Sequence, residues 1–132
     1  MKPTLDALPI TARQRIVQAC LFLVAMIALV GGALQMALGQ PDTTPRLDNM
    51  HRFMAGVYLG SGLIAAWTAA TIRRQGALVL LVAATVFLAG VGRLVSITQV
   101  GLPQPAVLWL GYLAPELVLP IVVAALHRGA AR

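Results

Sequence analysis

The most constraining feature of this sequence is a series of four long apolar segments separated by short polar connectors. The segments cover about residues 16–38, 53–72, 77–98 and 106–126. A helix that crosses the hydrocarbon core of a bilayer needs about 20 mostly apolar residues, and each segment meets that length. The connectors contain Gly, Pro and Arg residues, which disfavour continued helix. The sequence therefore predicts one all-α domain, a polytopic membrane protein folded as an up-and-down bundle of four transmembrane helices.

The composition excludes several other classes of protein. The chain is 59% hydrophobic and 11% charged, whereas soluble domains are about 45–50% apolar and about 25% charged. A net charge of +6 would fit a nucleic-acid partner only if the basic residues lined one exposed face, and here they flank apolar segments. Cys20 is the single cysteine and the histidines number two, which excludes an intrachain disulfide and a histidine- or cysteine-based metal or haem site. We expect no nucleic-acid partner, no metal and no cofactor.

The basic residues also predict the orientation of the chain in the membrane. Four spans place both chain ends on one side, where seven basic residues fall, against two on the other side. The seven are Lys2, Arg13, Arg15, Arg73, Arg74, Arg128 and Arg132, and the two are Arg46 and Arg52. The positive-inside rule then predicts cytoplasmic N and C termini. The first segment exceeds the about 7–15 apolar residues of a signal peptide, so we expect a span there rather than a cleaved leader.

Two charged residues fall inside the predicted spans. Arg93 lies roughly 8 Å below the outer end of its segment, and Glu116 lies roughly 15 Å deep, near the midplane. A lone charge at the bilayer centre costs at least about 3 kcal/mol. We therefore expect Arg93 and Glu116 to pair between the third and fourth segments. The alternative is that Arg93 extends to the outer surface while Glu116 is protonated.

Other polar residues fall at the same outer end. His51 and Arg52 begin the second segment directly after Asp48, and Asp48 or Asn49 is expected to cap that helix. Tyr112 lies one turn before Glu116 and shares its face. We predict one cluster at the outer end, with either a ligand-binding or a structural role and with no assigned catalytic residue. Its members are Asp48, His51, Arg52, Arg93, Tyr112 and Glu116.

Glycines within the apolar segments predict close helix packing. In the second segment Gly56 and Gly60 are four residues apart and are followed by Ser61 and Gly62. Small residues at this spacing let helix backbones approach closely. Further glycines lie in the first and third segments, at Gly31, Gly32, Gly90 and Gly92. We expect these surfaces to meet within one chain rather than between copies, because a four-helix chain needs several such contacts to fold.

Two stretches of the sequence resemble a known family. The first comprises Gly39-Gln40-Pro41, Asp48, His51-Arg52-Phe53, Ala55-Gly56-Val57-Tyr58 and Gly60. The second comprises Gly92-Arg93-Leu94, Ser96, Gly101, Pro103, Glu116 and Pro120. Over about residues 20–125 the chain resembles the DUF4345 family of small bacterial four-helix membrane proteins. The resemblance implies a multi-pass protein of the bacterial inner membrane and implies that Arg52, Arg93 and Glu116 belong to the family pattern. The family has no known function, so no activity is implied.

Three functions remain open. The first and preferred one is a non-enzymatic accessory or scaffold protein. The second is a membrane-embedded site, catalytic or not, for a lipid, quinone or isoprenoid head group, with Glu116 as acid or base and Arg93 and Arg52 holding an anion. The third is a small proton-coupled transporter, which the charge bias and the uncharged first segment disfavour. Expected partners are membrane lipids, together with another membrane protein or a second copy of the chain. Whether the protein is an enzyme is left undecided.

Overall fold

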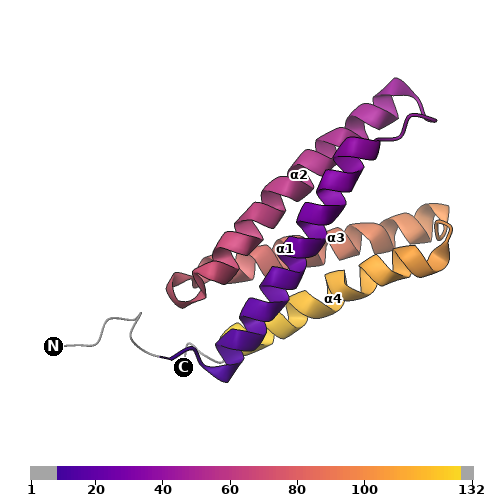
Figure 1. Cartoon of the computed structure of the whole chain (residues 1–132). Coiled ribbons are helices and arrows are strands. Elements are labelled where there is room, and N and C mark those ends of the chain that lie inside the picture. Colours follow the sequence, from indigo (N-terminus) through magenta and orange to yellow (C-terminus); the bar gives the residue numbers. More distant parts are fainter. Residues whose placement is uncertain (1–8, 129–132) are drawn as a thin grey trace. The chain divides into compact units, whose positions relative to one another are not determined.

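A computed structural model describes residues 9–128 of the chain (Figure 1). Its elements are α1 (Ala12–Leu38), α2 (Pro45–Ala70), the single-turn 3₁₀ helix η2 (Ile72–Arg74), α3 (Ala77–Val100) and α4 (Ala106–Arg128). The described residues contain no strand, and the predicted all-α class is confirmed. Each of the four α-helices is long and apolar enough to cross a membrane.

Helix α2 begins well before the apolar segment that predicted it. Its N-cap is Thr44, whose hydroxyl oxygen accepts a hydrogen bond of 3.4 Å from the Leu47 amide. Pro45 follows at the first helical position, where its fixed φ favours helix and no amide is needed. The expected cap at Asp48 or Asn49 is therefore wrong, because both residues lie inside the helix. Hydropathy marks the apolar part of a helix, whereas the cap and the proline fix its first residue.

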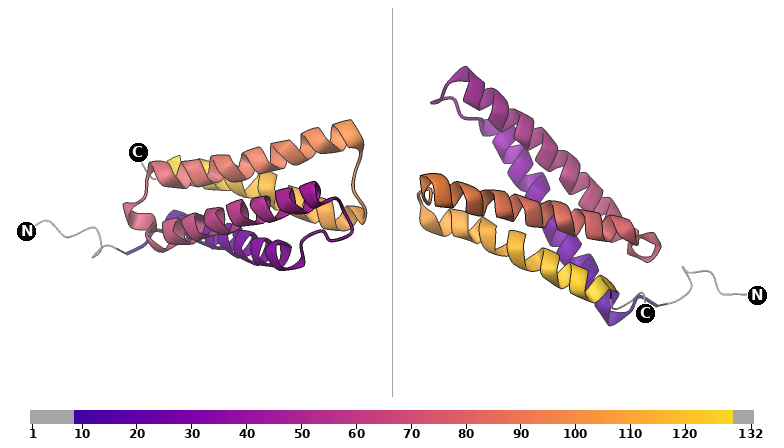
Figure 2. Two further views of the ribbon diagram at one scale, coloured as in Figure 1. Left: turned by 90° about the horizontal axis from the view of Figure 1, so that it is seen from above. Right: turned by 180° about the vertical axis from the view of Figure 1, so that it is seen from behind.

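The chain divides into two compact units, and each contains one helical hairpin. The first unit, Gln18–Thr71, contains most of α1 together with α2, and we call it the N-terminal hairpin. The second unit consists, among the described residues, of residues 72–128 together with residues 9–17. Its helices α3 and α4 form the C-terminal hairpin. Within each hairpin the two helices run antiparallel and side by side (Figures 1 and 2).

Two glycines bring α1 and α2 together in the N-terminal hairpin. A Cβ added to Gly32 would lie 3.0 Å from the main-chain oxygen of Ala55, and one added to Gly62 would lie 3.1 Å from the amide nitrogen of Leu29. Both contacts are with backbone atoms and are tighter than ordinary van der Waals contact, so a side chain at either position would push the helices apart. A Cβ added to Gly60 would have nothing within 4 Å. The expectation of close packing within the chain is confirmed at Gly32 and Gly62, while Gly60 takes no part in it.

A third glycine brings α3 against α4 in the C-terminal hairpin. A Cβ at Gly90 would lie 3.2 Å from the Cβ of Glu116 and 2.8 Å from a methyl carbon of Leu117. The far end of this hairpin is joined by His127, whose Nε2 lies 3.0 Å from the main-chain oxygen of Gly76. Gly90 precedes Arg93 by about one helical turn, so the close contact places α3 and α4 together next to the charged residues.

Candidate functional site

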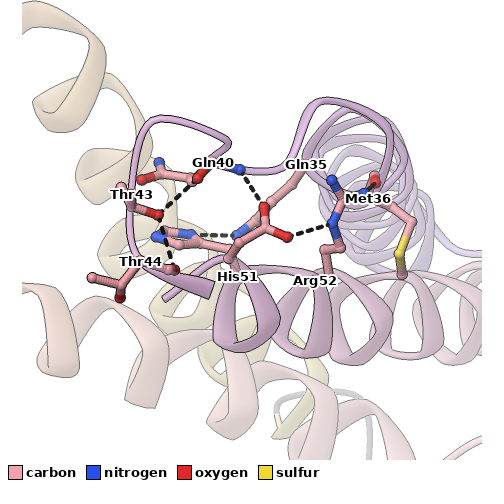
Figure 3. A network of polar contacts seen from close by, with 8 residues as sticks. Gln35, Met36, Gln40, Thr43, Thr44, His51 and Arg52 are labelled. Carbon is pink, nitrogen blue, oxygen red and sulfur yellow. Dashed lines mark hydrogen bonds and ion pairs between the residues drawn. The ribbon is translucent and has the colours of Figure 1, made fainter. Parts of the chain in front are cut away.

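Arg52 fastens the start of α2 to the end of α1 (Figure 3). Its Nη1 donates a hydrogen bond of 2.6 Å to the main-chain oxygen of Met36. Met36 lies in the last turn of α1, where main-chain carbonyls have no partner within the helix. A cation there also interacts favourably with the negative end of the helix dipole. Arg52 therefore caps the carboxyl end of α1 from the neighbouring helix.

Asp48 completes this arrangement from one turn earlier on α2. Its Oδ2 accepts a hydrogen bond of 2.9 Å from Nε of Arg52, and its Oδ1 accepts one of 2.7 Å from the amide of Gln40 in the connector. Beside them, Nε2 of Gln35 lies 3.2 Å from Nδ1 of His51 (Figure 3). We call the set Gln35, Met36, Gln40, Asp48, His51 and Arg52 the α1–α2 clasp. Its charged groups bind groups of their own hairpin.

Gly39 makes the clasp geometrically possible. Its φ is +57°, a left-handed conformation that side-chain-bearing residues rarely adopt and that commonly ends a helix. A Cβ at this position would also collide with the guanidinium of Arg52 and the carboxylate of Asp48. A glycine is therefore required at position 39, because any side chain there would occupy the space of the ion pair between Arg52 and Asp48.

The expected pair between α3 and α4 is present. Nε of Arg93 donates a hydrogen bond of 2.7 Å to Oε2 of Glu116. Measured from the helix ends at Val100 and Ala106, the Cα atoms lie about 10 Å and about 15 Å along their helices, and the long arginine side chain bridges the difference. The side chains are 27% and 13% exposed, respectively. Such a charge-assisted bond is stronger than one between neutral groups.

Two aromatic rings of α4 flank the arginine. The guanidinium carbon of Arg93 lies 5.7 Å from the ring centroid of Trp109 and 5.5 Å from that of Tyr112, within the range of cation–π attraction. Trp109, Tyr112 and Glu116 follow one another at helical spacing and share a face of α4. We call these three residues and Arg93 the α3–α4 cluster. Sequence reasoning did not select Trp109, although its spacing from Tyr112 was the available signal.

Trp109 carries the one unsatisfied buried side-chain polar atom found among the described residues. Its indole Nε1 is shielded from solvent and has no hydrogen-bond partner. Buried polar groups in proteins almost always have a partner, so an exception calls for an explanation such as a bound molecule. The N–H is a donor only, and it therefore requires an acceptor.

The predicted site residues fall into two sets. Asp48, His51 and Arg52 meet in the N-terminal hairpin, whereas Arg93, Tyr112 and Glu116 meet in the C-terminal hairpin. Each set is brought together within its own hairpin, and the single cluster of all six stays a prediction. Within residues 9–128, no three His, Cys, Asp or Glu side chains gather in a way that could hold a metal ion.

Four helices of membrane-spanning length define the class: this is a multi-pass membrane protein. The chain belongs to the DUF4345 family, described as a domain of unknown function, whose sequence model matches residues 15–127. The resemblance drawn from the glycine, arginine and glutamate pattern is thereby confirmed. No curated protein and no solved structure matches the chain.

Proposed function

We propose that this protein is a non-enzymatic accessory or scaffold protein of the membrane. The observation that carries the proposal is that the charged side chains singled out from the sequence bind partners within their own hairpins. Arg52 joins α2 to the Met36 carbonyl of α1 and pairs with Asp48, and Arg93 joins α3 to Glu116 on α4. Groups used in this way hold helices in place and need no substrate to compensate them.

A folded variant that lacks the charges of both Arg93 and Glu116 tests this proposal. A strain lacking the gene would be complemented either with the wild-type protein or with the double variant Arg93→Gln/Glu116→Gln, at equal amounts in the membrane. The membrane-lipid and metabolite profiles of the strains are then compared by mass spectrometry. An accessory protein predicts that the double variant restores the wild-type profile. A profile like that of the deletion strain would instead favour catalysis or proton transport by Glu116.

The proposal includes a location in the bacterial inner membrane with both termini in the cytoplasm. Its support is the family resemblance and the count of basic residues. Among these basic residues, Lys2 and Arg132 lie outside the described residues, while Arg73 and Arg74 lie in η2, between α2 and α3. The connector of residues 39–44 would then face outward, with Asp42 exposed on it.

Cysteine accessibility tests this orientation. In a Cys20→Ser background, Asp42→Cys and Gly76→Cys place one thiol on each side, at exposed positions. Asp42 is used rather than Thr44 because Thr44 caps α2. An impermeant maleimide added to spheroplasts should label position 42 and spare position 76 until the membrane is permeabilised. The reverse pattern would invert the proposed topology.

The proposed partners are membrane lipids, with either another membrane protein or a second copy of the chain. Support for the lipids comes from large apolar side chains that are exposed on every helix, for example Met26, Trp67, Leu88 and Val107. Apolar surface of this kind suits acyl chains, which need no polar partners. Cross-linking in intact membranes followed by sizing would separate a homo-oligomer from a complex with a different protein.

A further inference from the structure

We propose that the α3–α4 cluster binds the phosphate head group of a membrane phospholipid, a role that goes beyond that of an accessory protein. The inference begins at the indole N–H of Trp109, a buried donor without an acceptor. Desolvating such a donor without a partner costs about 1–3 kcal/mol. A ligand oxygen that accepted this hydrogen bond would recover that cost.

The charge beside this donor selects an anionic ligand. The guanidinium of Arg93 lies over the Trp109 ring, with its central carbon 5.7 Å from the ring centroid. Arginine binds phosphate with a planar set of donors. A phosphate offers several oxygens, so one head group can accept from the indole and also lie against the arginine. The negative charge of Glu116 would repel the anion. However, the Glu116 side chain is 13% exposed and that of Arg93 is 27% exposed, so the positive charge is the more accessible of the two.

The position of the cluster favours a lipid over a dissolved anion. Trp109 is three residues from the start of α4 at Ala106, which places it about 5 Å below the helix end. Tryptophan is enriched at this depth, where lipid head groups meet the hydrocarbon core. The Cα of Arg93 is deeper, about 10 Å from the end of α3, and its side chain reaches the rings of Trp109 and Tyr112. A phospholipid in the same leaflet presents its phosphate at this level.

Trp109 itself supplies the signal for a binding experiment. The chain has two tryptophans, so Trp67→Phe leaves Trp109 as the sole indole. Protein in neutral detergent micelles is titrated with dioleoylphosphatidylglycerol, with dioleoylglycerol as the matched lipid without phosphate, and with inorganic phosphate. We expect a saturable change in Trp109 emission with the phospholipid alone. An equal response to dioleoylglycerol would overturn the proposal, and a response to inorganic phosphate would replace the lipid with a soluble anion.

Variants assign the binding to the cluster. Glu116→Gln removes the opposing carboxylate and should tighten phospholipid binding several-fold. Adding Arg93→Gln to that variant removes both charges of the pair. It should weaken binding about tenfold, the loss of one hydrogen bond to a charged group. Arg46→Gln, an equal loss of charge at an exposed position of α2, should leave binding unchanged. Each variant is first shown to be folded by circular dichroism and gel filtration.

Native mass spectrometry gives a second readout that does not depend on fluorescence. Retention of phosphatidylglycerol should fall several-fold in Trp109→Phe and stay unchanged in Trp67→Phe. If Trp109→Phe retains the lipid fully, or if Arg93→Gln/Glu116→Gln binds it as tightly as Glu116→Gln alone, the cluster is only a structural contact between α3 and α4.

Discussion

Arg93 meets Glu116 at 2.7 Å across the C-terminal hairpin and lies within 5.7 Å of two aromatic ring centroids on the same face of α4. The ion pair offsets two charges that would each be costly at membrane depth. The rings of Trp109 and Tyr112 add attraction to the guanidinium while shielding it. The pair therefore lets a chain with a very apolar composition retain two half-buried charges in its last two helices.

Arg93 and Glu116 should be energetically coupled, because each charge compensates the other. The loss of stability in the double variant should then be smaller than the sum of the losses in the two single variants. Glu116→Gln alone removes the negative charge that Arg93 pairs with and should lower the free energy of unfolding by about 3 kcal/mol. In Arg93→Gln/Glu116→Gln the loss should be smaller than the sum of the single losses. Denaturant unfolding in detergent measures all four proteins. Strictly additive losses would mean that the two side chains do not interact.

The α1–α2 clasp predicts different effects for two arginines of α2. Arg52→Gln removes the donor to the Met36 carbonyl and should lower the free energy of unfolding by about 1 kcal/mol. Arg46→Gln removes the same charge from an exposed position and should change stability by less than about 0.5 kcal/mol. Thermal unfolding of both variants in detergent provides the comparison. Equal effects would assign the loss to net charge and not to the clasp.

Gly39 should tolerate no side chain. Gly39→Ala forces an alanine into the left-handed region, which costs about 1–2 kcal/mol, and adds a collision with Arg52 and Asp48. Gly76→Ala is the control, because Gly76 has a negative φ and nothing within 4 Å of an added Cβ. The melting temperature of Gly39→Ala should fall clearly while that of Gly76→Ala stays near wild type. A wild-type melting temperature for Gly39→Ala would contradict the geometry of the clasp.

Two glycines of the N-terminal hairpin should respond to alanine in opposite directions. Gly32→Ala places a Cβ 3.0 Å from the main-chain oxygen of Ala55, so the backbone of α2 must shift by a few tenths of an ångström. We expect this shift to cost about 1–3 kcal/mol. Gly60→Ala meets nothing within 4 Å and should gain up to about 1 kcal/mol from helix propensity. Unfolding in detergent distinguishes them. A gain in stability for Gly32→Ala would refute the close approach of α1 and α2.

The amino-acid sequence alone determined the helical class and the number of long helices, and it favoured the pairing of Arg93 with Glu116 over the alternative in which the two side chains stay apart. These features follow from requirements that the bilayer imposes on each segment by itself. About 20 apolar residues are needed to span a bilayer, and a charge at that depth requires compensation. The start of α2 did not follow, because Thr44 and Pro45 set it outside the apolar segment. Hydropathy carries no information about a cap.

Only the tertiary structure decided which groups each predicted residue contacts. The sequence predicted that Arg52 lies at the outer end, but its hydrogen bond to the Met36 carbonyl depends on how the connector turns at Gly39. Likewise, Gly56 and Gly60 have the familiar packing spacing, yet Gly32 and Gly62 meet the neighbouring backbone. Spacing along one helix fixes which residues share a face. Which face meets a neighbour depends on the rotation of that helix against its partner, and this is set by the sum of many side-chain contacts across the hairpin.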